Sequence, residues 1–379
     1  MFNLGRRDFL KNLSLAGVGT FLSFSPIPHL NPEVLAKEKD DNLSLVEAKF
    51  YKKLPNKEVQ CQLCPRECSV GDGERGYCRV RENRNGVYYT LVHSRVCSAN
   101  VDPIEKKPFF HFLPGTTAFS IATGGCNLKC KFCQNWEISQ ARPEELKSFN
   151  LAPDKVAQYA TDLNSKSIAY TYSEPIVFYE YMVDCARAGK KRNVKSVMVS
   201  SGYIKKEPLR ELCQSLDAVK IDLKGFSQKY YQDICNVELG PVMDTLLELK
   251  KMGIWYEIVN LILPTLNDSP KEIKNMCDWI VKDLGVDVPI HFTRFYPLYL
   301  LKNLPVTPIS TLEKAKEIAD EAGMKFVYIG NVPGHKAEST YCPKCKKKLI
   351  DRTGFSINEM NLRDGKCRFC SEVIPGVWR

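Results

Sequence analysis

Three cysteines stand close together in the segment TGGCNLKCKFCQNW, at Cys126, Cys130 and Cys133. Three thiolates from one loop can hold three irons of a 4Fe–4S cube and leave the fourth iron open. Catalysis requires an open coordination position, whereas a structural metal site closes all four. A structural zinc or ferredoxin-like site is the alternative, but no fourth cysteine follows nearby in the sequence. The spacing C-x3-C-x2-C therefore predicts a catalytic iron–sulfur site, with Phe132 beside the cluster.

A second group of cysteines lies near the C-terminus and forms two C-x2-C pairs with 21 residues between them. This spacing is typical of a zinc ribbon, in which two knuckles close one tetrahedral site, although rubredoxin-type iron uses the same knuckles. Lys346 and Ser371 stand where a glycine usually follows each knuckle. We predict zinc or iron bound by Cys342, Cys345, Cys367 and Cys370.

A third group has the spacing C-x2-C-x3-C-x9-C and comprises Cys61, Cys64, Cys68 and Cys78. Four soft ligands can hold zinc or an auxiliary 4Fe–4S cluster, and a disulfide pair is a third possibility. Cysteines two or three residues apart converge on one metal more readily than they bridge to each other. A metal is therefore favoured, with zinc and an auxiliary cluster both left open. The other cysteines are interpreted as buried small apolar side chains: Cys97, Cys185, Cys213, Cys235 and Cys277.

The elements that position these groups alternate along the chain. Apolar strand-like runs recur as AFSIAT, SIAYTY, VKSVMVS, AVKIDL, YEIVNLIL, IHFTRFY and KFVYIG. Helical stretches such as DKVAQYATDL, EPLRELCQSL and STLEKAKEIADEAG separate them. Such alternation predicts an α/β fold with a parallel sheet and right-handed crossovers. Six or seven units indicate a partial (β/α)6 TIM-like barrel, with its chemistry at the carboxyl ends of the strands.

Polar residues follow several of these predicted strands. Glu174 follows the second strand, Ser201 the third, and Asp222 with Lys224 ends the fourth. His291 lies on the sixth strand. Because chemistry in a parallel barrel gathers at the carboxyl ends of its strands, these residues are candidates for the site.

Structural alternatives exist for each candidate. Ser173 and Glu174 fit a helix start, with Ser173 as the N-cap and an acidic first turn. Asp222 and Lys224 share one face of a strand and could form a surface ion pair. A lone histidine such as His291 is more often packed than functional.

The N-terminal segment resembles a targeting signal. Arg6 and Arg7 precede a moderately apolar stretch over 13–24, a pattern typical of a twin-arginine leader. We predict these parts in order: a signal segment (1–36), a linker (37–57), a four-cysteine lobe (58–115), a catalytic core (116–335) and a four-cysteine ribbon (336–379).

Charge and hydropathy exclude some classes of function. The net charge is +10, and residues 341–379 hold nine Lys or Arg against four Asp or Glu. Four thiolates around one zinc would reduce that local excess of five to three, so the basic charge is weak support for nucleic-acid binding. The longest apolar runs are strand length, which predicts no transmembrane span in the mature chain.

The motifs resemble those of the radical SAM (S-adenosylmethionine) superfamily, and specifically its pyruvate formate-lyase activating enzyme-like group. From about residue 58 to the end, the chain is similar to the radical SAM enzymes of the AmmeMemoRadiSam system. The segments that carry this resemblance are CQLCPRECSVGDGERGYCRV, PIEKKPFFHFLPG, GGCNLKCKFCQNWEIS, YTYSEPIVFYEY, KIDLKGF, HFTRFYP and YIGNVPGHKAESTYCPKC.

The resemblance implies a reaction. SAM chelates the open iron, one electron cleaves it to methionine and a 5′-deoxyadenosyl radical, and the radical abstracts hydrogen from a protein or small-molecule substrate. It implies that Glu174 holds the methionyl ammonium, Asp222 the ribose and Lys224 the carboxylate. Ser201 stands where relatives often carry Asn, so its SAM contact departs from the pattern.

Further roles implied by the resemblance concern the sixth strand and the partners. His291 would approach adenine or substrate, while no role is assigned to Arg294 or Tyr296, where relatives often carry His. An electron donor of the flavodoxin or ferredoxin type is expected, and Memo-like or AMMECR-like proteins are candidate partners. SAM dependence indicates the cytoplasm, whereas the leader indicates folded export, and the location stays open.

A rival interpretation is a non-catalytic metal-binding module that uses the ribbon and basic tail to bind nucleic acid or a protein partner. It predicts zinc in every cysteine group and no SAM cleavage. The aromatic residues are not arranged around the basic ones as a stacking platform, which disfavours nucleic acid.

Overall fold

The protein is described here from a computed structural model that covers residues 43–379. The predicted leader and the first part of the predicted linker lie outside the described residues. Residues 43–379 lie in one compact unit, and the predicted boundaries near residues 58, 116 and 336 stay predictions.

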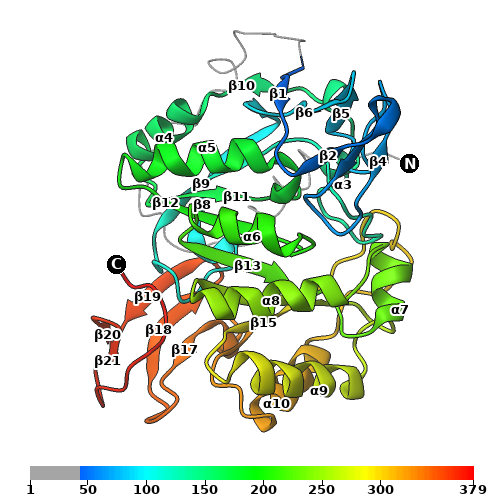
Figure 1. The fold of residues 1–379 in the computed structure, drawn as a ribbon. Helices are drawn as coiled ribbons and strands as arrows, with labels where there is room; N and C mark the ends of the chain where they lie inside the picture. Colours follow the sequence, from blue (N-terminus) through cyan, green and yellow to red (C-terminus); the bar gives the residue numbers. More distant parts are fainter. Residues whose placement is uncertain (1–42) are drawn as a thin grey trace, which may run out of the picture. The chain divides into compact units, whose positions relative to one another are not determined.

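An eight-stranded sheet forms the centre of the fold, with strand order β16-β15-β14-β13-β12-β11-β9-β8 (Figure 1). β8 (Ser98–Pro103) runs antiparallel to β9. The other strands are parallel: β9 (Thr117–Ala122), β11 (Ser167–Tyr170), β12 (Lys195–Ser200), β13 (Ala218–Asp222), β14 (Trp255–Ile262), β15 (Ile290–Arg294) and β16 (Val327–Gly330). Within residues 43–379, β8 and β16 do not pair, so the barrel is open.

Helices connect these strands and lie side by side on one face of the sheet (Figure 1). Their bounds are α4 (Pro153–Asp162), α5 (Tyr179–Lys190), α6 (Lys206–Cys213), α8 (Gly240–Met252), α9 (Pro270–Trp279) and α10 (Ile309–Glu321). Six strand–helix units followed by a seventh parallel strand confirm the predicted α/β class and partial barrel. The antiparallel β8 was not predicted, because its sequence SANVDP lacks an apolar period.

Each parallel strand is apolar because helices cover one side and the barrel interior the other. All four residues of β11 are buried, as are four of the five in β13. The interior face also carries charged side chains. Lys220 of β13 lies in register with Glu257 of β14, and His291 of β15 lies in register with Val259 of β14. The interior is therefore partly polar.

Short strands build the parts on either side of the barrel sequence. The N-terminal part contains β1 (Val46–Glu47), β2 (Tyr51–Lys53), β3 (Val59–Cys61), β4 (Ser69–Val70), β5 (Arg81–Arg84) and β6 (Val87–Thr90), in two three-stranded sheets. β7 (Arg95–Val96) pairs with β10 (Phe149–Asn150). The C-terminal part contains β17 (Thr340–Tyr341), β18 (Lys348–Thr353), β19 (Ser356–Met360), β20 (Leu362–Arg363) and β21 (Lys366–Cys367).

The C-terminal part packs against the barrel where its strands begin. Phe110, Phe326 and Tyr328 share one buried apolar cluster with Leu349 and Ile350 of β18. Arg352 donates from Nη2 to the carbonyl oxygen of Phe110 at 2.8 Å. The ribbon thus closes the end of the barrel at which the parallel strands start.

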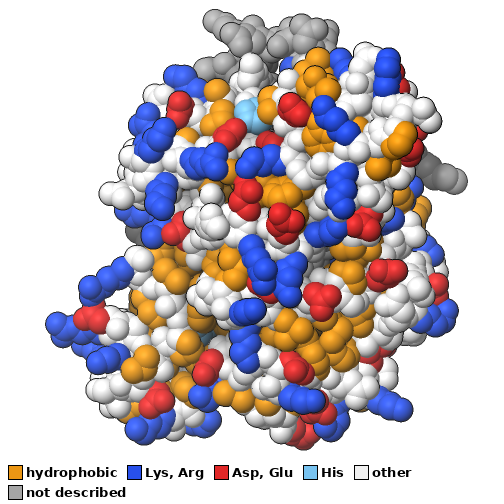
Figure 2. Space-filling view, in the orientation of Figure 1, with side chains coloured by type: hydrophobic (Ala, Val, Ile, Leu, Met, Phe, Trp, Pro, Cys, Tyr) orange, Lys and Arg blue, Asp and Glu red, His pale blue; other side chains and the backbone are white. Residues whose placement is uncertain are grey.

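The surface mixes charges of both signs. Figure 2 shows Lys and Arg side chains interspersed with Asp and Glu over the face drawn. Among residues 43–379, no helix is long and apolar enough to cross a membrane.

Candidate active site

The loop that carries the three central cysteines follows β9 directly. Neighbouring segments hold it by backbone hydrogen bonds, since Gly125 N donates to Ile138 O at 2.9 Å and Lys131 N to Ile234 O at 2.9 Å. Gly125 has φ +94, and a Cβ there would lie 2.8 Å from Cys78 O and 2.5 Å from Val80 Cγ1. Only glycine fits at this position, because Cys78 and Val80 of the N-terminal lobe occupy the space that a side chain would need.

Cys130 is buried, while Cys126 and Cys133 are partly exposed. Leu128 N donates to Cys126 Sγ at 3.3 Å, and Ser139 Oγ lies 3.2 Å from Cys133 Sγ. Burial raises the pKa of the Cys126 thiol, and the neighbouring charges of Glu174 and Cys130 add to this effect. The three sulfurs therefore lie near one another and near a carboxylate.

Glu174 follows β11 and is buried. Its Oε1 accepts a hydrogen bond from Ser200 Oγ at 2.6 Å. Its Oε2 accepts two from Ser201, from N at 2.9 Å and from Oγ at 2.6 Å. Burial raises the pKa of Glu174, and these hydrogen bonds partly offset the increase. Ser201 thus helps to orient Glu174, and its predicted contact with SAM stays a prediction.

The predicted N-cap at Ser173 is wrong. Glu174 occupies that position and accepts from Ile176 N at 3.3 Å, at the start of the 3-10 turn Pro175–Phe178. The Oγ of Ser173 is buried without a hydrogen-bond partner. Proline at the first helical position favours the residue immediately before it as the cap.

Asp222 ends β13 and forms an ion pair with Lys224, two residues further on, whose Nζ lies 3.1 Å from Asp222 Oδ2. Lys220, which the sequence analysis missed, approaches the other carboxylate oxygen. Burial disfavours the ionised carboxyl, but the two ammonium groups outweigh it and hold the pKa of Asp222 at about 2. Lys224 Nζ also lies 5.5 Å from the centroid of the Phe132 ring, which joins this pair to the cysteine loop.

A second interior network, also missed, surrounds Asp102 of β8. Lys106 donates to Asp102 Oδ1 at 2.7 Å, and Lys107 and Tyr172 both reach Oδ2. Burial lowers the pKa of Lys107 to about 8, although Asp102 opposes the shift. Tyr172 has φ +66, a conformation rare for a non-glycine residue. The adjacent lysines in IEKKP were the only sequence signal.

A fourth cysteine lies beside the loop after all. Cys235 is buried and lies close enough to Cys130 to lower the pKa of its thiol. Lys129 N donates to Cys235 O at 3.2 Å, which holds the two segments together. Because the two residues are about a hundred positions apart, the sequence offered no signal for their contact.

His291 does not lie with these residues. It is the second residue of β15, near the opposite end of the barrel, and its Nε2 lies 2.7 Å from Glu257 Oε2. Its ring packs against Phe110 and Tyr328. These contacts match the alternative of a packed histidine, and the expected contact with adenine or substrate stays a prediction.

The two remaining candidates of this strand lie at its far end. Arg294 Nε donates to Thr307 O at 2.8 Å, and its guanidinium lies 5.5 Å from the centroid of the Tyr296 ring. Tyr296 is exposed. Neither residue gains a role from these contacts.

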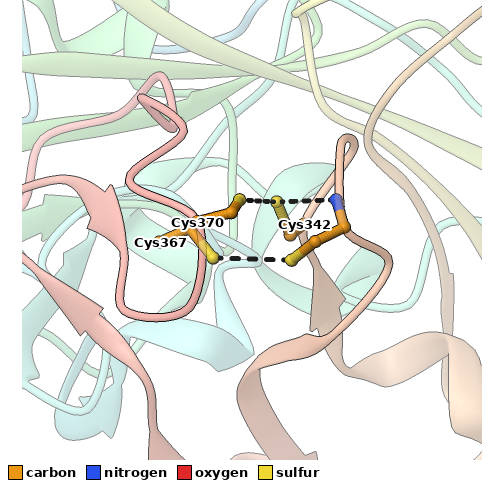
Figure 3. A group of neighbouring side chains, drawn as sticks. Cys342, Cys367 and Cys370 are labelled. Atoms are coloured by element: carbon orange, nitrogen blue, oxygen red, sulfur yellow. Dashed lines mark hydrogen bonds between the residues drawn. The ribbon is translucent and has the colours of Figure 1, made fainter.

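The ribbon cysteines gather as predicted. Cys342 Sγ lies 3.6 Å from Cys370 Sγ, and Cys345 Sγ lies 3.7 Å from Cys367 Sγ (Figure 3). Lys346 and Ser371 adopt φ of +59 and +60, the left-handed conformation that glycine usually supplies after a knuckle. The four sulfur ligands can hold one metal ion, and whether that ion is zinc or iron stays open.

This chain is similar to several known proteins. The family model of the radical SAM superfamily matches residues 120–280. The uncharacterized protein MJ0808 of Methanocaldococcus jannaschii is 46% identical, over 87% of this chain and 99% of the relative. The chain belongs to the radical SAM superfamily. A pyruvate formate-lyase-activating enzyme of Clostridium pasteurianum is 23% identical over 42% of this chain and 67% of the relative. The GTP 3′,8-cyclase of Aquifex aeolicus is 24% identical over 68% of this chain and 87% of the relative.

Membership of the radical SAM superfamily makes this protein an enzyme and implies a 4Fe–4S cluster, SAM and an electron donor. The loop fits the cluster, because its three neighbouring thiols supply the soft ligands that iron–sulfur clusters take. The expected roles of the individual site residues stay predictions.

Proposed function

We propose that this radical SAM enzyme is an activating-enzyme-like oxidoreductase that abstracts hydrogen from a protein or small-molecule substrate. One observation carries the proposal. Three groups lie together at the carboxyl ends of the strands: the three-cysteine loop, the buried Glu174 and the Asp222–Lys224 pair. Glu174 lies near Cys126, and Lys224 lies over the ring of Phe132 in the loop. Such convergence at one end of a parallel barrel is typical of an active site.

The chain's own residues supply binding and orientation. Cys126, Cys130 and Cys133 would hold the cluster, which when bound supplies the electron that cleaves SAM to methionine and a hydrogen-abstracting 5′-deoxyadenosyl radical. Glu174, oriented by three hydrogen bonds from two serines, would bind the methionyl ammonium. Lys224 would face the SAM carboxylate. The buried position of these groups excludes water that would compete for each contact.

The substrate and partners are proposed at a coarser level. A reduced flavodoxin- or ferredoxin-type protein would deliver the electron. Memo-like or AMMECR-like proteins are candidate partners through the family resemblance. The N-terminal lobe over 58–115 and the ribbon over 336–379 would flank the core as appendages.

The central test is reductive SAM cleavage by the protein reconstituted without oxygen. Wild type and the control Cys213→Ala, a buried cysteine on α6 away from the loop, are expected to form 5′-deoxyadenosine under reduction. Cys126→Ala is expected to abolish it. Intact cleavage in Cys126→Ala, or zinc without sulfide in every cysteine group, would favour the non-catalytic module instead.

Glu174→Gln tests the ammonium contact separately. Loss of the carboxylate charge is expected to weaken SAM binding by about ten- to a hundredfold, since hydrogen bonds to charged groups contribute roughly 1.5–3 kcal/mol. The iron content should be unchanged. Unaltered SAM affinity by calorimetry would remove Glu174 from the site.

A further inference from the structure

The two four-cysteine groups differ in how closely their sulfurs approach. In the part of the chain that the structure describes, the ribbon is the only group of Cys, His, Asp or Glu whose ligand atoms all lie within 4.8 Å of one another. Zn–S bonds of about 2.3 Å in a tetrahedron place the sulfurs about 3.8 Å apart. The ribbon distances of 3.6 and 3.7 Å match this spacing. The spacing of the ribbon sulfurs therefore fits a single metal ion.

The N-terminal cysteines surround a cavity instead. Cys61, Cys64, Cys68 and Cys78 all line one pocket that is partly open to solvent. Thiolates that bind the corners of an iron–sulfur cube stand farther apart than thiolates that touch one ion, because the cube lies between them. The wider spacing of these four sulfurs fits a cube better than a zinc ion.

Arg81 points to an anionic occupant of this cavity. It lines the space, is 1% exposed, and has an Nη1 without a hydrogen-bond partner. Its Nη2 lies 2.6 Å from Glu180, so part of the cation is already paired. A buried donor left unsatisfied costs roughly 1–3 kcal/mol, and more for a charged group. An anionic cluster beside Nη1 would accept this hydrogen bond.

Apolar side chains and one glycine shape the rest of the space. Leu63, Ile176 and Tyr88 line it and are buried. A Cβ on Gly76 would lie 2.5 Å from Tyr88 Oη, so a side chain there would displace the ring. The lining thus shields an occupant from water, as iron–sulfur clusters require for a set potential.

The cavity adjoins the SAM-cleaving loop. Asn127, the residue after Cys126, also lines it, and Arg66 donates to Asn127 O at 2.6 Å. We propose that Cys61, Cys64, Cys68 and Cys78 bind a second 4Fe–4S cluster, with Arg81 hydrogen-bonded to it. All four irons would have cysteine ligands, so this cluster can exchange electrons but leaves no iron open to SAM.

The test uses the full chain with Cys126, Cys130 and Cys133 all changed to Ala. After anaerobic reconstitution, this variant is expected to keep about four irons and four acid-labile sulfides per chain. It is also expected to show a cluster signal by electron paramagnetic resonance after reduction. The result does not depend on SAM cleavage, which this variant lacks, so its failure is distinct from failure of the proposed function.

Two added changes locate the cluster. Cys61→Ala with Cys64→Ala in the same background should remove iron and sulfide, whereas the matched control Cys213→Ala should not. Cys68→Ser, at a partly exposed ligand, gives the same readout with less risk to folding, which circular dichroism checks. A second zinc without sulfide, or no metal in the triple variant, would overturn the proposal.

Discussion

Each end of the barrel holds a buried glutamate, and the two are bound differently. Glu174, at the carboxyl strand ends, is held by Ser200 and Ser201 and lies beside Cys126. Glu257, near the strand starts, accepts from the backbone nitrogens of Phe110 and His111 and contacts His291. Both carboxylates are desolvated, but the first is bound by serines beside a cysteine and the second by backbone nitrogens and a histidine.

The difference separates function from stability. The hydrogen bond with His291 and the backbone donors outweigh burial and hold the pKa of Glu257 below its usual value. These contacts tie the segment after β8 to the strands and the ribbon. At the other end, burial raises the pKa of Glu174 despite its serines. In parallel barrels the carboxyl end carries chemistry and the other end stability.

The largest expected effect is loss of the ribbon metal at the base. Cys342→Ser with Cys367→Ser should destabilise the protein by more than about 4 kcal/mol, since a structural metal contributes folding free energy directly. Both cysteines belong to the cluster that packs on Phe110 and Tyr328. Calorimetry should show a melting temperature lower by about 10 °C or more. An unchanged value after proven metal loss would contradict a stabilising role.

Glu257→Ala should cost about 3–5 kcal/mol, because it leaves several buried donors without an acceptor. SAM affinity per folded molecule should stay at the wild-type value. Glu174→Ala is the matched variant at the other end and should show the reverse pattern, a loss of SAM binding larger than its loss of stability. If both variants lose SAM binding equally, the comparison between the two ends fails.

Acidic pH should lower the stability of the protein through His111, which lies near the strand starts of the barrel. Burial lowers the pKa of His111 to about 4, from an unfolded value near 6.5. The unfolded state therefore binds more protons between these values, and stability falls as the pH decreases from about 6.5 to 4, by about 3 kcal/mol in full. Urea unfolding across this range measures the loss.

His111→Phe should remove the part of the pH dependence that His111 contributes, whereas His291, whose burial also lowers its pKa, should keep its own part. The His111 ring lies between Pro375 O and Tyr328 Oη, at 2.7 and 2.6 Å. His335→Gln, a change near the exposed Glu313, is the control and should leave the dependence in place. The same acid slope in His111→Phe would place the responsible group elsewhere.

The smallest expected effect is that of Ser201→Ala, at the carboxyl ends of the strands. One hydroxyl donor to Glu174 is lost while Ser201 N remains, which should weaken SAM binding about five- to tenfold at nearly unchanged stability. Ser215→Ala, away from the site, is a control. A loss of stability without a change in SAM affinity would make Ser201 purely structural.

Much of the fold could be predicted because its signals are local. Alternating apolar runs and helical periods predicted all seven parallel strands. The antiparallel β8 was not predicted because its sequence has no such period. The N-cap was wrongly placed at Ser173 rather than Glu174 because the choice between two adjacent acceptors depends on which one the serines of β12 and its loop hold.

The residues of the candidate site could likewise be predicted only where their signal was local. Cysteine spacing alone identified the central loop and both other groups, since ligands a few residues apart must converge on one centre. By contrast, Tyr172 and Cys235 are far along the chain from Asp102 and Cys130, the residues that they approach, so no local pattern marked these contacts. The position of His291 near the start of β15 could not be predicted, because a strand's sequence does not say where along the barrel each of its residues lies.

By itself, the sequence determined the strand and helix alternation and the three cysteine groups, because both depend on neighbours along the chain. Only the tertiary structure decided how far apart the sulfurs stand, which end of the barrel each glutamate occupies, and which charges meet inside. Those features depend on distances between segments far apart in sequence. A ribbon spaced for one ion and a cavity lined by four cysteines can look alike in sequence and differ only once the chain has folded.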